Sequence, residues 1–173
     1  VSAGPGLAVG VGQCRSAAGG AWPLAQAAVA RQGHAVGVRL YAEDPAQDFR
    51  PGSGRLDHLR LPEPSPHIRI DSGVIQGDTV SIFYDPMIAK LIVWDVDRPA
   101  ALLRMRDALA QCEIRGPKSN IDFLERLIRH PVVVEGRIDT GYLDQHLDEV
   151  LTHPPANEQQ LAAAAIAALL HDA

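Results

Sequence analysis

The polar residues with the clearest chemical pattern lie in the segment HIRIDSGV, residues 67–74. In an extended chain successive side chains point to opposite faces, so His67, Arg69 and Asp71 share one face and two isoleucines share the other. A guanidinium fixed between polar neighbours is suited to binding or stabilising an anion. The alternative is an exposed sheet face on which Arg69 pairs with Asp71 or Glu63.

A lysine stands in the middle of YDPMIAKLIVWD, residues 84–95, which otherwise has the composition of a buried strand. An unpaired ammonium is costly in an apolar interior, so the Lys90 side chain must extend to water or pair with a carboxylate. Candidates are Asp71, Glu43 and Asp44. We predict a buried ion pair that fixes the register of the strand and supports the residues around the arginine, in preference to a direct role in catalysis.

Other patterns that commonly carry chemistry are missing from the sequence. Seven histidines form no His-x3-His pair, and Cys14 and Cys112 form no Cys-x2-Cys pair, so no metal site is predicted. The glycine-rich stretch GPGLAVGVG, residues 4–12, lacks the lysine of a phosphate-binding loop. No serine motif typical of a nucleophile is found.

Composition and charge narrow the class of protein. Of the 173 residues, 46% are hydrophobic and 21% are charged, as in an ordinary soluble domain. The net charge of −5 comes without a basic stripe, which argues against nucleic acid, and no apolar run is long enough for a membrane span. Without a secretion signal or a disulfide framework we expect a cytoplasmic protein. Because the chain begins with Val1, we expect it to be a fragment.

Hydrophobic periodicity predicts short strands followed by helices. Alternating apolar and polar residues indicate strands at 34–42, 55–61, 67–74, 79–83, 84–94 and 113–116. Their close spacing favours an antiparallel sheet or a small barrel. Helices are indicated at 97–112, 120–130 and 141–150, and from Asn157 to His171. Ser119 and Asp122 are spaced like a capping box at the start of the second helix.

Several of these segments, taken in order, resemble the C-terminal domain of biotin carboxylase. The matching stretches lie between residues 33 and 147: GHAVGVRLYAEDP, PGSGRL, RIDSGV, GDTVSIFYDPMIAKLIVW, RMRDALAQCEIRGPKSNIDFLERLI and TGYLDQHL. The resemblance is greatest to the alpha subunit of bacterial acyl-CoA carboxylases of the methylcrotonyl-, propionyl- or acetyl-CoA type. It implies a ligase that carboxylates biotin with bicarbonate and MgATP.

The resemblance also implies a role for one site residue. Arg69 matches the family arginine that helps to stabilise the enolate form of biotin. The resemblance does not by itself give Lys90 a chemical role, and we expect His67, Asp71, Lys90 and Asp85 to support Arg69 from around it. A homodimer contact is implied near the end of the lysine strand, with Trp94, Asp97 and Arg98 as interface residues.

The family's ATP-grasp region, which holds ATP and Mg2+, has no counterpart in residues 1–32, and this chain contains no complete cofactor site. Phosphoryl transfer needs positioned nucleotide and metal, so we predict that the isolated chain is inactive. The partners implied are the ATP-grasp region of the same subunit, a biotin carboxyl carrier domain and a carboxyltransferase beta subunit. No nucleic acid or membrane partner is expected.

These observations together predict an α+β domain at 33–150, with an antiparallel, barrel-like sheet of the barrel-sandwich hybrid type and flanking helices. Residues 1–32 are expected to be a poorly defined segment, and 151–173 a linker with the first helix toward a next domain. The alternative function is a non-catalytic, carboxylase-derived module for interaction or oligomerisation. A C-terminal domain from another ATP-grasp ligase is a third hypothesis.

Overall fold

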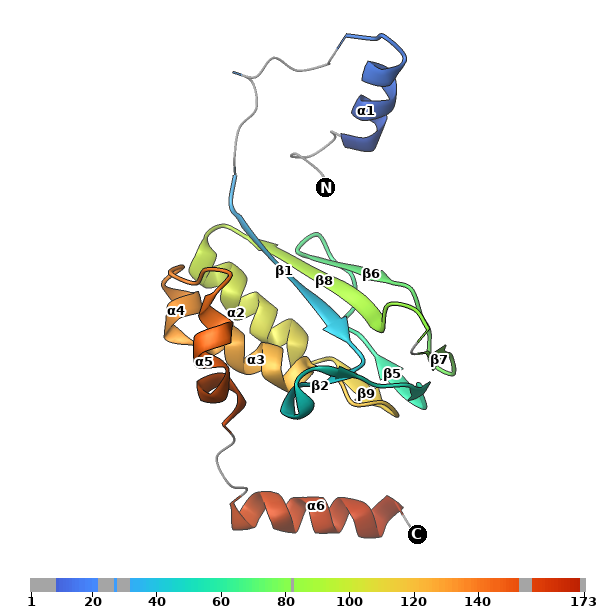
Figure 1. Cartoon of the computed structure of the whole chain (residues 1–173), viewed down its shortest axis with the longest axis vertical. Helices are drawn as coiled ribbons and strands as arrows, with labels where there is room; N and C mark the ends of the chain where they lie inside the picture. Colours follow the sequence, from blue (N-terminus) through green and yellow to red (C-terminus); the bar gives the residue numbers. More distant parts are fainter. Residues whose placement is uncertain (1–8, 22–26, 28–31, 82, 153–156, 172–173) are drawn as a thin grey trace.

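A three-stranded antiparallel sheet forms the centre of the fold (Figure 1). The computed structural model describes residues 9–21, 27, 32–81, 83–152 and 157–171. In the sheet, β8 (Met87–Asp95) lies between β1 (His34–Tyr41) and β6 (Ile68–Ser72). The strands predicted at 34–42 and 67–74 are confirmed, as is a mixed architecture of helices and antiparallel sheet.

The two faces of this sheet differ in polarity because side chains alternate along each strand. Its apolar face consists of Val36, Val38 and Leu40 from β1, Ala89, Leu91 and Val93 from β8, and Ile68 and Ile70 from β6. Removing such side chains from water is the main source of folding free energy. The core of the domain therefore lies on this face.

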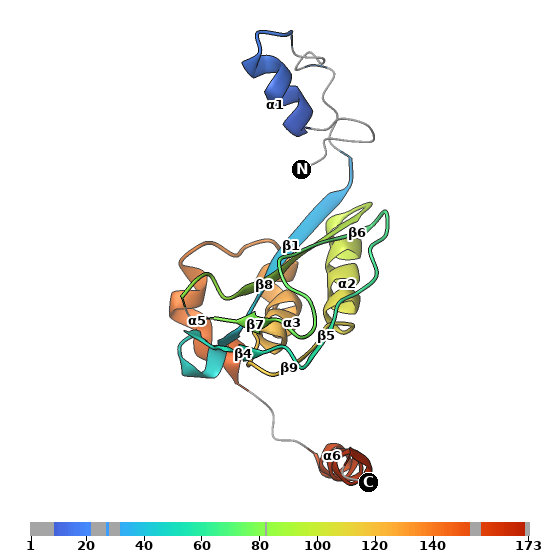
Figure 2. The same cartoon turned by 90° about the vertical axis from the view of Figure 1, so that its right-hand side faces the viewer.

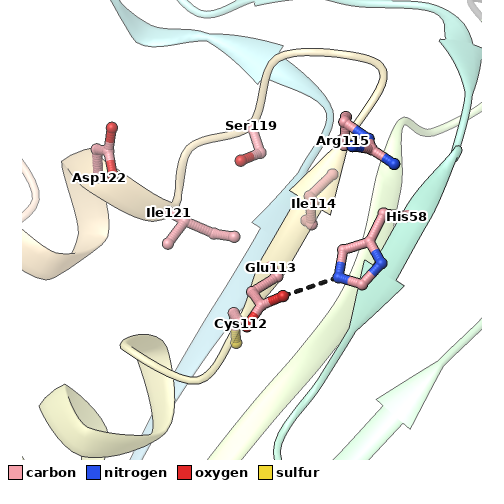
Figure 3. Close-up of a pocket in the computed structure, with 8 residues that line it drawn as sticks. All are labelled: His58, Cys112, Glu113, Ile114, Arg115, Ser119, Ile121 and Asp122. Carbon is pink, nitrogen blue, oxygen red and sulfur yellow. Dashed lines mark hydrogen bonds and ion pairs between the residues drawn. The ribbon is translucent and has the colours of Figure 1, made fainter. Parts of the chain in front are cut away.

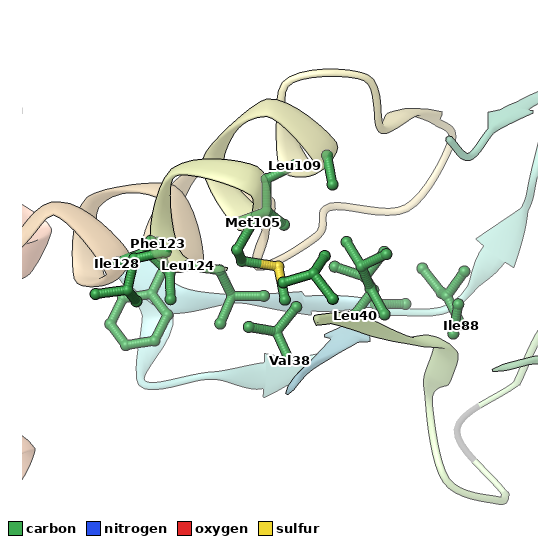
Figure 4. Packing of buried hydrophobic residues seen from close by; sticks show 14 of the residues in the cluster. Val38, Leu40, Ile88, Met105, Leu109, Phe123, Leu124 and Ile128 are labelled. Atoms are coloured by element: carbon green, nitrogen blue, oxygen red, sulfur yellow. The ribbon is translucent and has the colours of Figure 1, made fainter. Parts of the chain in front are cut away.

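Helices pack on the apolar face and lie on one side of β1 and β8 (Figures 1 and 2). Helix α2 (Arg98–Leu109) contacts β1 and β8 directly, and α3 (Ile121–Arg129) contacts α2 and β1. The short α4 (Pro131–Val134) and α5 (Tyr142–Leu151) contact α3. Figure 4 shows how Met105 and Leu109 of α2 meet Val38 and Leu40 of β1.

The remaining strands form three separate two-stranded antiparallel ladders. These are β2 (Glu43–Asp44) with β3 (Arg50–Pro51), β4 (Gly54–Arg55) with β7 (Thr79–Val80), and β5 (His58–Arg60) with β9 (Glu113–Arg115). A 3-10 turn, η2 (Pro45–Gln47), follows β2. Among the described residues these ladders and the central sheet do not close into a barrel, so a barrel-sandwich arrangement is not confirmed.

Several predicted boundaries differ from the structure. The strand expected at 55–61 is interrupted, and the strand expected at 79–83 shrinks to two residues. The lysine strand begins at Met87 because Pro86 and an Asp85 side-chain turn precede it, leaving Tyr84 outside the sheet and 85% exposed. A residue without a backbone N–H cannot contribute a donor to a ladder, which explains the later start.

The start of α3 also differs from the capping-box prediction. Its N-cap is Asn120 rather than Ser119, and no side chain caps it. Asn120 is buried, and its side chain instead bonds to β1: Oδ1 accepts from Tyr41 N (3.0 Å) and Nδ2 donates to Arg39 O (3.1 Å). The amide thus satisfies edge groups of β1 in the way that a neighbouring strand would.

The ends of the chain each contain a helix. Helix α1 (Val9–Ala17) lies within the segment predicted to be poorly defined, and α6 (Glu158–His171) matches the last predicted helix. The centre of the predicted linker, 153–156, lies outside the described residues. In the part of the chain that the structure describes, no helix is both long and apolar enough to cross a membrane.

Candidate functional site

The polar side of the central sheet brings the predicted site residues together. We call it the open face: Ala35, Gly37 and Arg39 from β1, Lys90, Ile92 and Trp94 from β8, and His67, Arg69 and Asp71 on or beside β6. These residues are exposed or half-buried. The register places Arg69 opposite Ile92 and Asp71 opposite Lys90. The alternation predicted for HIRIDSGV is therefore confirmed.

Arg69 is held at one end of its guanidinium and open at the other. Its Nε donates to Asp71 Oδ1 at 2.9 Å, and the two side chains are 57% and 46% exposed. The hydrogen bond from Arg69 lowers the pKa of Asp71, with smaller contributions from the charges of Arg69 and Lys90. The same bond raises the pKa of Arg69. Because only Nε is engaged among the described residues, both terminal NH2 groups remain available to donate to an anion.

His67 and Trp94 form an aromatic pair at one end of the open face. Their rings stack at a centroid distance of 5.4 Å and an interplanar angle of 27°. His67 Nδ1 lies 3.1 Å from Trp94 O, and Trp94 Nε1 donates to Gln32 O at 3.2 Å. These contacts fix the orientation of His67, two residues from Arg69. In the described part of the chain no hydrogen bond joins the side chains of His67 and Arg69.

The ion pair predicted for Lys90 is not found in the structure. It is half-buried, and among the described residues no carboxylate lies within 4.0 Å of its ammonium, so the predicted buried ion pair is absent. Each candidate partner bonds elsewhere: Asp71 to Arg69, Asp44 to Lys118 (2.6 Å), and Glu43 to Asn120 (3.0 Å). Burial of Glu43 raises its pKa, an effect that the Asn120 bond partly offsets.

Asp85 is not brought to Arg69. Its Oδ1 accepts from Met87 N at 3.1 Å, in the turn before β8, whereas Arg69 lies opposite Ile92. Met87 and Ile92 are five positions apart along β8, roughly 17 Å at the usual rise of a strand. Asp85 therefore starts the strand and does not contact the open-face arginine.

The predicted interface residues divide between surface and interior. Asp97 is the N-cap of α2, accepting from Ala100 N at 2.9 Å. Arg98 turns inward, with one NH2 group 3.2 Å from His34 Nε2 and the other donating to Val133 O at 2.5 Å. Trp94 remains 38% exposed. Arg98 thus ties α2 to β1 and α4, which is a structural role.

A separate pocket of about 550 Å3 lies between β9 and the loop before α3 (Figure 3). His58 Nε2 is 2.8 Å from Glu113 Oε2, and Arg60 donates to Glu113 Oε1 at 3.0 Å. Burial raises the pKa of Cys112 to about 11, so this thiol stays protonated at neutral pH and is a poor nucleophile. The residues that line this pocket do not belong to the open face, and no group of three metal-ligating side chains gathers among the described residues.

One residue of the open face was missed by sequence reasoning. Arg39 lies directly opposite Lys90 across β1 and β8. The alternation of 34–42 already placed Arg39 on the polar face, which was the available signal. Its neighbour could not be read from the sequence, because Arg39 and Lys90 belong to segments that are far apart along the chain.

The chain is similar to known proteins in sequence and in fold. The family model for the biotin carboxylase C-terminal domain matches residues 37–145. The chain is 44% identical over 151 residues to the mitochondrial methylcrotonoyl-CoA carboxylase subunit alpha of Dictyostelium discoideum, covering 87% of this chain and 22% of that protein. It is 40% identical over 135 residues to a biotin carboxylase from Nostoc, covering 78% of this chain and 30% of that protein.

The fold matches solved structures as well. The biotin carboxylase domain dimer of 2-oxoglutarate carboxylase from Hydrogenobacter thermophilus, in complex with MgADP, ADP and bicarbonate, aligns with a TM-score of 0.75 at 32% identity. That alignment covers 83% of this chain and 31% of the other. The fold is thus that of a biotin-dependent carboxylase component.

More narrowly, the chain belongs to the biotin carboxylase C-terminal domain family. It spans about a fifth of the length of the methylcrotonoyl-CoA carboxylase subunits that it matches.

Proposed function

We propose that this chain forms the biotin-side wall of the site at which a biotin-dependent acyl-CoA carboxylase carboxylates biotin, using ATP and bicarbonate. The observation that carries the proposal is Arg69, exposed on the open face with Nε bonded to Asp71 and both terminal NH2 groups available. A fixed cation with free donors is suited to an oxygen on which negative charge develops. Arg69 is the catalytic residue of this chain, and Asp71 and His67 position it.

The proposed binding of biotin depends on the hydrogen-bond donors of the Arg69 guanidinium. Biotin brings a ureido group that accepts the carboxyl group, and Arg69 would bind its oxygen. ATP and Mg2+ would be held by an ATP-grasp region, as the resemblance to the family implies. The chain alone is therefore proposed to be inactive, because positioning and charge neutralisation of the phosphates are essential for phosphoryl transfer.

The surface supports a covering partner. Exposed apolar side chains gather between β6 and β8 in the sequence: Ile75 is 72% exposed, Phe83 92% and Tyr84 85%. Large exposed apolar residues commonly mark contacts with other proteins. We propose that the ATP-grasp region of the same subunit covers this segment. In its absence we expect self-association, and a monodisperse monomer in light scattering would count against this part of the proposal.

The same proposal assigns roles to the parts of this chain in a larger carboxylase assembly. Residues 33–150 would be the functional domain, and 151–173 would lead toward the parts that meet a biotin carboxyl carrier domain and a carboxyltransferase beta subunit. A homodimer contact would use Trp94 and Asp97. Arg98 would support that contact from inside, because its guanidinium is engaged by His34 and Val133. A cytoplasmic location remains a prediction, and the relative in Dictyostelium discoideum is a mitochondrial protein.

The proposal is tested by joining the chain to the ATP-grasp region of a biotin carboxylase and measuring biotin- and bicarbonate-dependent release of ADP. The chain alone should show none, whereas the fusion should be active. Arg69→Ala should lower kcat of the fusion by about 10²- to 10³-fold, the usual effect of removing one donor to a developing anion. Arg60→Ala is the matched control, because Arg60 is an exposed arginine paired with Glu113 in another ladder.

Three results would decide against the proposal. ADP release by the isolated chain would contradict its dependence on a partner. Equal activity of the Arg69→Ala and Arg60→Ala fusions would remove Arg69 from the site. An inactive fusion that still associates with carboxylase subunits would favour the alternative, a non-catalytic interaction module, for which the exposed Phe83 and Tyr84 are the supporting observation.

A further inference from the structure

Strand β9 lies at the edge of its ladder and borders a pocket. In the described part of the chain it pairs only with β5. The pocket of about 550 Å3 in Figure 3 is lined by all three residues of β9, with Ile121 and Asp122 completing the lining. Ile114 also lines a second pocket, of about 380 Å3. An unpaired strand edge presents backbone donors and acceptors to any strand that can reach it.

The hydrogen bonds around the ladder show which backbone groups of β9 point away from β5. In an antiparallel pair, residues that exchange hydrogen bonds with their partner alternate with residues whose N–H and C=O point outward. Leu59, the partner of Ile114, donates its N–H to Gln76 Oε1 at 3.2 Å. The N–H of Cys112 is engaged by Leu109 O at 3.0 Å. The N–H and C=O of Ile114 therefore point outward, and no hydrogen bond within the described residues engages either group.

The two residues that flank Ile114 carry opposite charges. Glu113 and Arg115 are exposed and lie on the same face of β9. Glu113 is bonded to His58 and Arg60 of β5. Arg115 lies opposite His58, and no carboxylate of the described residues lies within 4.0 Å of its guanidinium. The order acid, isoleucine, base is complementary to itself when a second copy of the strand runs antiparallel to the first.

We infer that the free edge of β9 is a self-association surface, at which β9 of a second copy of this chain pairs antiparallel about a two-fold axis. Ile114 then lies opposite Ile114 of the partner subunit and exchanges both backbone hydrogen bonds with it. Glu113 lies opposite Arg115 of the partner subunit, and the reverse pair follows from the symmetry. Each Arg115 thereby gains a carboxylate, and this charge complementarity identifies the occupant of the edge.

The contact is separate from the proposed catalytic role, because β9 shares no residue with the open face. Addition of a strand to a sheet edge is a recognised mode of protein association. A contact built on three residues from each copy belongs with small interfaces, below about 1,200 Å2, which are weak and transient. The dimer should therefore form in proportion to the protein concentration.

The test is sedimentation velocity of the full chain over a series of concentrations. Arg115→Glu places like charges opposite each other at both ends of the contact, and so does Glu113→Arg. Each variant alone should associate about tenfold more weakly than the wild type. An equimolar mixture of the two variants should recover association, because every acid then faces a base again.

Arg137→Glu is the matched control for Arg115→Glu. Arg137 is an exposed arginine paired with Glu135, outside the ladder, and its substitution changes the net charge equally. This variant should associate like the wild type. Hydrogen exchange resolved by residue adds a measurement that needs no substitution: the Ile114 amide should exchange more slowly as the wild-type dimer forms.

Several results would overturn the inference. They are a wild-type chain that stays monomeric, an Ile114 amide that exchanges equally fast in the dimer, and folded variants whose mixture remains dissociated. Association that persists unchanged in Arg115→Glu would also overturn it, and would assign the contact to the exposed segment around Phe83 and Tyr84. These measurements do not involve Arg69, whose role is judged by the fusion experiment alone.

Discussion

Asp71 determines how Arg69 presents its donors. The carboxylate engages only Nε, which leaves the guanidinium with one fixed edge. Asp71→Asn should keep the fusion folded but lower kcat by roughly tenfold, less than loss of Arg69 itself, because the amide holds the guanidinium less firmly. The measurement is steady-state kinetics of the fusion with biotin varied. An unchanged kcat would show that Asp71 does not position Arg69.

The hydrogen bonds of the Asn120 side chain lead to a prediction about the stability of the fold. It is buried, and its side chain bonds to Tyr41 N, Arg39 O and Glu43 Oε1. Asn120→Ala would leave buried polar groups unpaired and should lower the free energy of unfolding by about 2–3 kcal/mol. Urea denaturation measures this loss.

Ser119→Ala is the matched control for Asn120, because Ser119 does not cap α3. It should change the free energy of unfolding by less than about 0.5 kcal/mol. A loss as large as that of Asn120→Ala would restore the capping-box hypothesis and contradict the role assigned to the amide.

At this scale the sequence predicted the face of Arg69 and its pairing with Asp71, but not the surroundings of Lys90. The alternation in residues 67–74 was enough to place Arg69 and Asp71 together, because both belong to one short strand. The Lys90 ion pair failed for a physical reason: every candidate carboxylate found a closer partner once the strands were assembled. Competition of this kind depends on distances that a sequence does not contain.

Among the elements, α2 joins the helical layer to the sheet. Met105 is fully buried and packs beside Val38 and Leu40 of β1 (Figure 4). Leu103 on the same helix is 55% exposed. Met105→Ala should cost about 2–5 kcal/mol, because it removes buried surface and leaves a cavity. Leu103→Ala should cost less than about 1 kcal/mol. Thermal and urea unfolding of both variants check the difference, and equal losses would contradict the packing of α2.

Strand boundaries were the least predictable part of the elements. The core strands β1 and β6 followed from periodicity, since a buried face repeats every second residue. The two-residue ladders did not, because such short pairings are fixed by loops. Gly116 shows this: at φ +129° an added Cβ would lie 2.0 Å from Arg55 O, so glycine allows the chain to pass close to β4 before α3.

At the scale of the whole molecule, carboxylates near the surface make the free energy of unfolding depend on pH in the acidic range. Five carboxylates have pKa values below the ordinary value of 3.8 for aspartate or 4.5 for glutamate, because hydrogen bonds and neighbouring cations stabilise their charged form. They are Asp44, Asp71, Asp95, Glu113 and Glu149. A lowered folded pKa means that the unfolded chain binds protons more readily. Their contribution is thus complete above the unfolded pKa values and is lost as pH falls through the folded ones.

Glu43 has the opposite sign, since burial raises its pKa and its protonation favours the folded state. Five carboxylates with lowered pKa values outweigh the single one with a raised pKa. The free energy of unfolding should therefore be constant from pH 7 to about 5 and fall steadily between pH 4.5 and 3. Urea titrations at these pH values measure it. A flat profile down to pH 3 would show that the five pairings do not form in solution.

The sequence by itself determined the period-two strands, the polar face that carries Arg69, the amphipathic helices and the resemblance to the biotin carboxylase C-terminal domain. These are local properties, set by the alternation of side chains along a few residues. Only the tertiary structure decided that β8 lies between β1 and β6, that Arg39 faces Lys90, and that Arg98 turns inward. Those relations join segments distant in the chain, and they follow from which strands pair and which charged groups reach each other first.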